Sequence, residues 1–511
     1  ETARGVVWTP PSRVRSAMIL LQTMREAGIT AVRVTRPLPE EALAVADTLG
    51  LRLFVDLPAM YHSAATLREA LPPLREEIAR IGDRARSHPS LHAVGLVQNS
   101  ATHRVATCAL IDTLATAVRR AAPSHVQTYY MTLFPPAHDQ CADRVDQVLV
   151  DLRGGAQPNE RWAAWQAHPT HVGVGAVGTW VDPEAARGLA VPHSVDRHAR
   201  FLEEHVPPLL RSTPVVFVSR WRDAQPPGPR RFGLHNTEGS ERPAMRVVRG
   251  LYTERQTTFA LPTGRPPAES SRLVLIGWGI LAGMMLLYAQ FPTVQRTAQR
   301  YARAHVFYRD TLREGRDVLP GCSTALIVQA FVTLGMIVYV VGQQAAAVPR
   351  STWILELASG GVGEALATWL ASPSFAAGSV VALTAVVSGF WMILLSGIAQ
   401  RYGRFSFTQV LMLVAWPCWM ALVGLLAVLV VPTMASSGLV IPSMLVGLGT
   451  ASLLITLRIV RDYVAVTKVP PLVAASLTLF SPLGVLLIGG TVLLRRAEVP
   501  LDLLWHVLMH A

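Results

Sequence analysis

The stretch that decides the fold is HPSLHAVGLVQNS, at residues 88–100. It predicts a helix end and a Pro-marked turn, followed by a short apolar strand that delivers Gln98, Asn99 and Ser100 to its carboxyl end. In a β/α barrel the carboxyl ends of the strands carry the chemistry. The stretch therefore predicts a strand whose polar end lies at the functional face, provided that the neighbouring segments complete such a barrel.

The same alternation continues on both sides of this stretch. Strands are predicted at residues 5–9, 30–35, 51–57, 91–98, 125–132, 147–152, 171–180 and 214–218, separated by helices that include 14–27, 40–49, 67–85, 105–121, 160–167 and 195–210. Eight such units indicate a closed (β/α)8 barrel of the α/β class. A doubly wound open sheet is the alternative, but no Gly-rich phosphate loop follows the first strand.

Composition divides the chain near residue 271. Residues 1–271 contain 26 of the 34 acidic residues and 12 of the 15 histidines, and long uncharged apolar runs follow. We therefore expect a barrel domain at 1–256, a linker at 257–271 and an all-α transmembrane domain at 272–511. The net charge of +12 does not indicate a nucleic-acid partner, because the first 271 residues hold 31 arginines against 26 acids and no dense basic block.

The second half of the chain predicts several membrane crossings. Apolar segments of sufficient length predict six spans, at about residues 273–295, 322–342, 377–399, 407–431, 439–457 and 472–494. Residues 351–374 predict a surface or re-entrant helix. The segment around Trp505 predicts a segment that lies in the membrane interface. Arg-rich loops at 293–320, 401–404 and 458–468 alternate with loops of little positive charge. The positive-inside rule places these three loops in the cytoplasm and the barrel outside it, as in a multi-pass protein of a bacterial-type inner membrane.

Residues 88–100 resemble the fourth-strand signature of glycoside hydrolase family 2, the β-galactosidase and β-mannosidase type. In that family HPS opens the strand and an Asn-Glu pair closes it. RGVVWTPP at 4–11 and MREAGITAVRVTRPLPEEALAVADTLGLRLFVDLP at 24–58 resemble the family's first strands. WRDAQ at 221–225 and RRFGLHNTEGSERPAMRVVRGLY at 230–252 resemble its eighth strand and final helix.

The resemblance covers residues 5–256 and implies a sugar pocket at the strand ends. Its candidate pocket residues in this chain are Arg33, Asp56, Gln98, Trp180, Trp221 and Asp223. For Arg33 the alternative is an ion pair inside the barrel, and for the tryptophans it is packing over the barrel core. Spans two to six, preceded by FYRDTLREGRDVLPG at 307–321 and including AWPCW at 415–419, resemble the Yip-type five-helix family.

The two catalytic positions depart from the family pattern. Retaining glycosidases need two carboxyl groups about 5 Å apart, one as acid/base and one as nucleophile. Here Gln98-Asn99 replaces the Asn-Glu pair, and HVGVGAVGTWV at 171–181 has Ala176 where the family pattern has Glu. Both expected carboxylates are absent. Other acids near strand ends are candidates to replace them, namely Asp56, Asp139, Asp143, Asp151 and Asp182.

These observations favour a non-catalytic, membrane-anchored protein. We expect its barrel to bind a protein or glycan partner and its six-span base to associate with other integral membrane subunits. The alternatives are an active membrane-bound glycoside hydrolase that uses other acids, and a transport-associated accessory subunit. Neither a metal nor a cofactor is expected, since the histidines lack metal-ligand spacing.

Two further features of the first half concern its cellular compartment. Cys108 and Cys141 fall on consecutive β/α units, so they form either a disulfide, in an oxidising compartment, or two buried thiols. The chain begins at Glu1. This start is consistent with removal of a secretory signal or with loss of an upstream segment.

Overall fold

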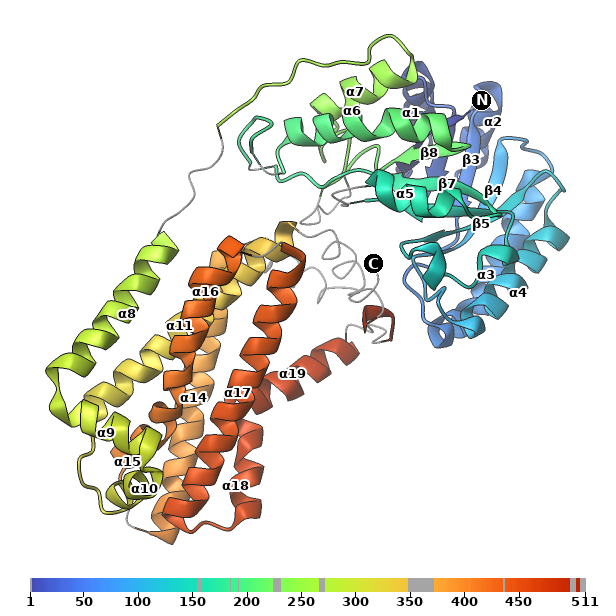
Figure 1. Ribbon diagram of the computed structural model, residues 1–511. Coiled ribbons are helices and arrows are strands. Elements are labelled where there is room, and N and C mark those ends of the chain that lie inside the picture. The colour runs from blue at the N-terminus through green and yellow to red at the C-terminus, as the bar shows by residue number, and fades with distance from the viewer. Residues whose placement is uncertain are drawn as a thin grey trace. The chain divides into compact units, whose positions relative to one another are not determined.

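The computed structural model describes residues 2–153, 158–183, 185–191, 193–223, 231–265, 272–347, 372–403, 405–434, 437–496 and 502–505. The chain divides into two compact units (Figure 1). The first contains Glu1–Pro267 together with the C-terminal segment Val499–Ala511, and the second contains Ala268–Val348 and Gly360–Glu498.

The first unit is a closed barrel of eight parallel strands, which confirms the predicted fold. The strands are β1 Ala3–Trp8, β2 Ala31–Val34, β3 Arg52–Asp56, β4 Leu91–Gln98, β5 Gln127–Thr132, β6 Gln147–Asp151, β7 His171–Val177 and β8 Val215–Val218. Ala3 pairs with Val215, so β8 closes the barrel against β1. The Val-rich strands suit a sheet that is buried on both faces.

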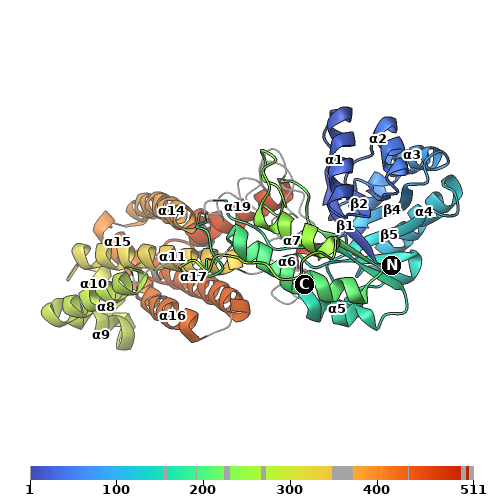
Figure 2. The ribbon, with the colours of Figure 1, turned by 90° about the horizontal axis from the view of Figure 1, so that it is seen from above.

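Helices cover the outside of the strands, as Figure 2 shows for the first four. They are α1 Val14–Glu26, α2 Glu40–Thr48, α3 Ala64–Ala85, α4 Val105–Ala121, α5 Pro158–Gln166, α6 Val195–Ser212 and α7 Pro243–Tyr252. The fifth strand is followed instead by two short 3-10 turns, η1 Pro136–His138 and η2 Ala142–Arg144. A disulfide joins Cys141, beside the second turn, to Cys108 on α4.

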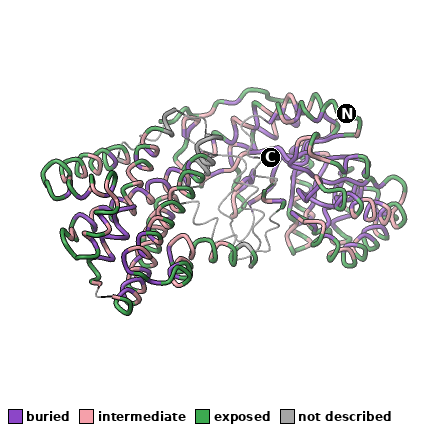
Figure 3. The backbone as a smooth tube through the Cα atoms, turned by 60° about the horizontal axis from the view of Figure 1, so that its bottom comes forward, coloured by how far each residue is buried: buried purple, intermediate pink, exposed green. Residues whose placement is uncertain are grey.

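Two layers of apolar side chains form the core of the barrel, whose strands are largely buried (Figure 3). The inner layer contains Phe54, Tyr129, Met131 and Phe217. Gly95 on β4 makes room among them, because a Cβ there would lie 2.6 Å from the Oδ1 atom of Asp56 and 2.6 Å from the Tyr129 ring. The glycine therefore permits the polar contact between Asp56 and Tyr129 inside the barrel.

The second unit is helical. Its elements are α8 Arg272–Gln290, α9 Pro292–Arg303, α10 His305–Arg313, α11 Pro320–Ala347, α14 Pro373–Tyr402, α15 Phe407–Ala415, η3 Trp416–Met420, α16 Ala421–Met434, α17 Ser437–Thr467, α18 Pro471–Leu477, η4 Thr478–Phe480 and α19 Pro482–Arg496. Among the described residues, five helical segments are long and apolar enough to cross a membrane. A sixth crossing requires the pair Pro471–Phe480 and Pro482–Leu493, bent by 58°, to act as one span. The expected helix at 351–374 lies almost entirely outside the described residues.

A buried ionic cluster joins two of the predicted Arg-rich loops. Asp462, on α17, is only 1 % exposed and accepts hydrogen bonds from Arg309 (2.6 Å) and His305 (2.9 Å), both on α10. The helix α17 continues to Thr467, beyond the end predicted for this span. Residues 458–467 are therefore helical rather than a loop, and they contact the 293–320 segment directly.

Candidate functional site

The polar residues at the end of β4 define the candidate site. Asn99 follows the strand in a left-handed backbone conformation, with a φ of 49°, and its side chain is fully buried. Its Nδ2 donates to Asp151 Oδ2 on β6 at 2.8 Å and lies 3.5 Å from the Tyr61 hydroxyl. The side chain of Asn99 thus points across the strand ends, toward a carboxylate.

Asp151, at the end of β6, lies beside both Asn99 and Ala176. Besides its contact with Asn99, it pairs in register with Ala176 on β7. Arg153 donates to it from both Nε and Nη2, the latter at 2.7 Å. Burial opposes ionisation of this carboxyl, but Arg153 and the Asn99 amide outweigh it and hold the pKa of Asp151 below its usual range. The carboxylate is therefore ionised and already paired.

A second buried ion pair lies inside the barrel. The Arg33 Nη2 atom lies 2.8 Å from Asp56 Oδ2, and its Nη1 donates to the Gly175 carbonyl at 2.9 Å. The Tyr129 hydroxyl donates to Asp56 at 2.7 Å, and burial together with this negative charge raises the pKa of Tyr129 well above 10. Arg33 and Asp56 thus neutralise one another, which is the alternative considered for Arg33.

The remaining candidate residues differ in accessibility. Gln98, Trp221 and Asp223 are buried. Asp223 accepts from Arg242 Nη2 at 2.6 Å and from the Gly233 backbone N–H, so it fixes the segment that follows β8. Trp180 is half-buried and stacks on the ring of His193 at 3.6 Å between centroids. Trp180 is the one candidate aromatic with surface available for a ligand.

Ala176 contributes no polar side chain to the site. It is buried in the inner apolar layer of the barrel, and its carbonyl accepts from the Leu152 backbone N–H at 2.8 Å. Neither Asn99 nor Ala176 therefore places a carboxylate at this end of the barrel. The residues described here also contain no group of three His, Cys, Asp or Glu side chains placed to hold a metal ion.

Two residues near the site were not identified as partners from the sequence. Arg153 follows Asp151 by two positions, and the motif Asp-x-Arg at a strand end is a usable signal for such a pair.

His198, on α6, is fully buried, and neither ring nitrogen has a hydrogen-bond partner among the described residues. Burial, with a smaller effect of Arg242, lowers the pKa of His198 to about 3. A single histidine in an amphipathic helix does not show from the sequence that its ring is fully buried without a hydrogen-bond partner.

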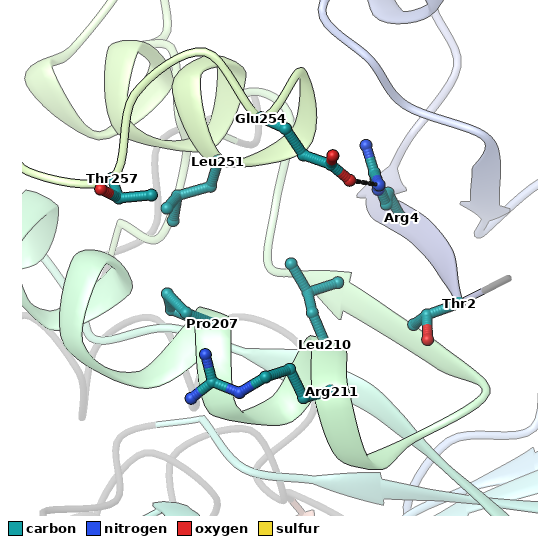
Figure 4. A pocket seen from close by; sticks show the side chains of 8 residues that line it. All are labelled: Thr2, Arg4, Pro207, Leu210, Arg211, Leu251, Glu254 and Thr257. Carbon is teal, nitrogen blue, oxygen red and sulfur yellow. Dashed lines mark hydrogen bonds and ion pairs between the residues drawn. The ribbon is translucent and has the colours of Figure 1, made fainter.

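A cavity of about 310 Å³ lies at the opposite end of the barrel (Figure 4). Thr2 and Arg4 line it from the start of β1, with Leu210 from the end of α6 and Leu251 from the end of α7. Arg4 forms an ion pair with Glu254 beside it. This is the amino-terminal face of the strands, which in such barrels serves stability rather than chemistry.

Comparisons with known proteins return similarities among solved structures only. No protein-family model matches the sequence, and no curated protein matches it. A family 2 β-galacturonidase from Eisenbergiella tayi, bound to galacturonate, is 14 % identical with a TM-score of 0.44, covering 50 % of this chain and 52 % of that chain. A β-glucuronidase from Ruminococcus gnavus is 13 % identical with a TM-score of 0.44, covering 50 % and 51 %. The chain spans about half the length of these structures.

Proposed function

We propose that this is a membrane-anchored protein whose family 2-like barrel does not hydrolyse glycosides. The barrel binds a protein or glycan partner, and the helices associate with other integral membrane subunits. The observation that carries the proposal is the contact between Asn99 and Asp151. An amide occupies the acid/base position of the family pattern, and it is bonded to a carboxylate that Arg153 also neutralises.

The alternative, an active hydrolase that uses other acids, meets a chemical difficulty. A glycosidase acid must hold its proton near neutral pH, which requires a raised pKa. The pKa of Asp151 is lowered instead, and Asp56 is paired with Arg33. Each of these two carboxylates would have to lose its arginine before it could act as an acid. Burial raises the pKa of Asp139, which follows β5 and accepts a hydrogen bond from the Tyr130 hydroxyl at 2.6 Å, so this carboxyl is the candidate acid that the hydrolysis assay has to test.

The disulfide supports an extracytoplasmic barrel. A bond between Cys108 and Cys141 forms and persists in an oxidising compartment, such as the periplasm of a bacterium. The contact between Asp462 and Arg309 is consistent with this topology, since it joins two segments that the positive-inside rule assigns to one side. We infer six spans in an inner membrane, with the bent pair crossing once.

Outward-facing glycines support lateral association. Gly279 and Gly283 on α8 form a G-x-x-x-G pair, and an added Cβ at either would meet no atom within 4 Å. Only 6 % of the apolar window of α8 is buried within the structure. Helix faces of small residues permit close approach of a second helix in a bilayer. One helix is sufficient for tethering, so the further spans point to a role in assembly.

A hydrolysis assay tests the catalytic part of the proposal. The detergent-solubilised protein is incubated between pH 4 and 8 with a panel of aryl β-glycosides, including β-galactosides, β-mannosides and β-glucuronides. No turnover above the buffer rate is expected. Turnover that Asp139→Asn, Asp151→Asn or Asp56→Asn abolishes, and that the matched control Asp83→Asn on the exposed surface of α3 leaves intact, would overturn it.

Cross-linking in native membranes tests the association. Gentle extraction after cross-linking should recover other integral membrane proteins with this chain. The double variant Gly279→Leu, Gly283→Leu should recover them several-fold less well. The matched control is Gly389→Leu on α14, where an added side chain also meets open space. A monodisperse monomer that recovers no partner contradicts the assembly role.

A further inference from the structure

The last described residues of the chain pack against the barrel. Residues 502–505 form one helical turn within the same compact unit as the strands. Leu503 is fully buried, in a cluster with Tyr61, Ala101, Leu133 and Phe134. Leu504 packs against this cluster, whereas Trp505 is 65 % exposed. The turn therefore presents one apolar face to the barrel and one face to solvent.

The cluster lies at the carboxyl ends of three neighbouring strands. Tyr61 follows β3, Ala101 follows β4, and Leu133 and Phe134 follow β5. The Tyr61 hydroxyl is 3.5 Å from Asn99 Nδ2, so Leu503 packs on the side chain that borders the candidate site. The C-terminal segment thus lies on the functional face of the barrel rather than on its helical exterior.

The surface that receives Leu503 is held by backbone hydrogen bonds. The Tyr61 N–H donates to the Gln98 carbonyl at 2.8 Å, and the Ala101 N–H donates to the His62 carbonyl at 3.0 Å. The Phe134 carbonyl accepts from Trp165 Nε1 at 3.1 Å. Tyr61 itself has a φ of 56°, a left-handed conformation that a tyrosine keeps only where its surroundings fix it. These contacts preform an apolar site for one inserted side chain.

We propose that this apolar site is a binding site for the chain's own C-terminal segment, with Leu503 as its anchor. Residues 502–505 act as a resident ligand at the barrel mouth. They cover Tyr61 and restrict approach to Asn99 from the β3–β5 side. A partner that binds at this side of the mouth must displace the segment or bind on top of it.

The contact between Leu503 and the barrel also determines whether the number of membrane crossings is even or odd. This inference rests on the proposed membrane anchorage. The barrel precedes the first apolar helix and residues 502–505 follow the last one. Because both belong to one compact unit, they lie on the same side of the membrane. The chain then crosses an even number of times, and among the described residues it is the bent pair that can complete a sixth span after the five long ones.

Site-specific photo-cross-linking tests the resident ligand. p-Benzoylphenylalanine replaces Leu503 or, where its bulk is better tolerated, the half-buried Leu504. A protease site inserted between Pro267 and Ala268 separates the barrel from the remainder of the chain after irradiation. The two fragments should stay linked on a denaturing gel, with the cross-link mapping near Tyr61 or Phe134.

The matched control carries the same label at Trp505, whose side chain faces solvent, and should cross-link several-fold less. Fragments that separate for both Leu503 and Leu504, or equal linkage at positions 503, 504 and 505, would overturn the proposal. The readout requires neither a substrate nor a partner. Failure of the non-catalytic or assembly role would therefore leave this result unchanged.

Discussion

The side-chain amide of Asn99 donates a 2.8 Å hydrogen bond to the buried carboxylate of Asp151. Asn99 follows β4 and Asp151 ends β6, so their contact spans β5, the strand between them, at the barrel mouth. Asp151 also accepts from Arg153, which leaves one negative charge shared between a cation and an amide. The arrangement holds Asp151 in its ionised form.

Asn99→Asp tests this contact by replacing the donor with a second carboxylate. We expect the unfolding free energy to fall by about 2–4 kcal/mol at pH 7, because a buried hydrogen bond is lost and two like charges face each other. The loss should shrink below pH 4, where one carboxyl is protonated. Thermal unfolding at several pH values measures it. Asn236→Asp is the control, since the Asn236 Oδ1 accepts backbone N–H groups and an aspartate can replace it. Equal losses at both positions would contradict the argument.

The Arg33–Asp56 pair should show strong coupling in a double-mutant cycle. Arg33→Leu leaves Asp56 buried without its cation, which costs about 3–5 kcal/mol of unfolding free energy. Asp56→Leu strands Arg33 in the same way. The double variant should lose clearly less than the sum of the single losses, as measured by denaturant unfolding. Additive losses would show that the two charges act independently.

His198 should make the barrel less stable as the pH falls. Its pKa is about 3 in the folded state, against 6.5 for an ordinary histidine, so the unfolded chain binds more protons between these limits. Stability therefore falls as the pH is lowered from 6.5 toward 3, by about 1.4 kcal/mol per pH unit. His198→Leu should remove the contribution of His198 to this slope, a gain of about 2 kcal/mol at pH 5 relative to pH 7, and should leave the smaller contributions of other buried histidines. The control, His125→Leu at an exposed position, should keep the wild-type slope.

The barrel could be predicted because its signals are local. The strand at 91–98 and the helix at 105–121 have the bounds expected from period and turn residues. The partners of the charged groups could not be predicted, because they are distant in sequence. Asn99 meets Asp151 over a separation of 52 residues, and Arg309 meets Asp462 over 153. The sequence predicts that the span ends at residue 457, whereas α17 continues to Thr467. The charged residues after 457 favour a loop unless the buried contact between Asp462 and Arg309 is known.

The contact between the C-terminal segment and the barrel also joins residues distant in sequence, and it could not be predicted either. Apolar residues around Trp505 predict an interfacial segment, whereas Leu503 packs against the barrel residues Tyr61 and Phe134.

Cysteine labelling of intact cells distinguishes six membrane crossings from five. Trp505→Cys, at a 65 % exposed position, should react with a membrane-impermeant maleimide without permeabilisation. Gln299→Cys, on the exposed side of α9 in the Arg-rich segment, should react only after permeabilisation.

The wild-type chain is the control for labelling of the native cysteines. Cys108 and Cys141 form a disulfide and Cys322 is buried, so the half-buried Cys418 is the native thiol that can contribute background labelling. Six crossings separate positions 299 and 505 on opposite sides of the membrane, since one crossing precedes position 299 and five follow it before position 505. Five crossings in total would place both positions in the cytoplasm, and both cysteines would then need permeabilisation. That outcome would also remove the barrel contact of Leu503, because the barrel and residue 505 would lie on opposite sides. Labelling of Gln299→Cys in intact cells, with Trp505→Cys protected, would invert the orientation while keeping the even number of spans.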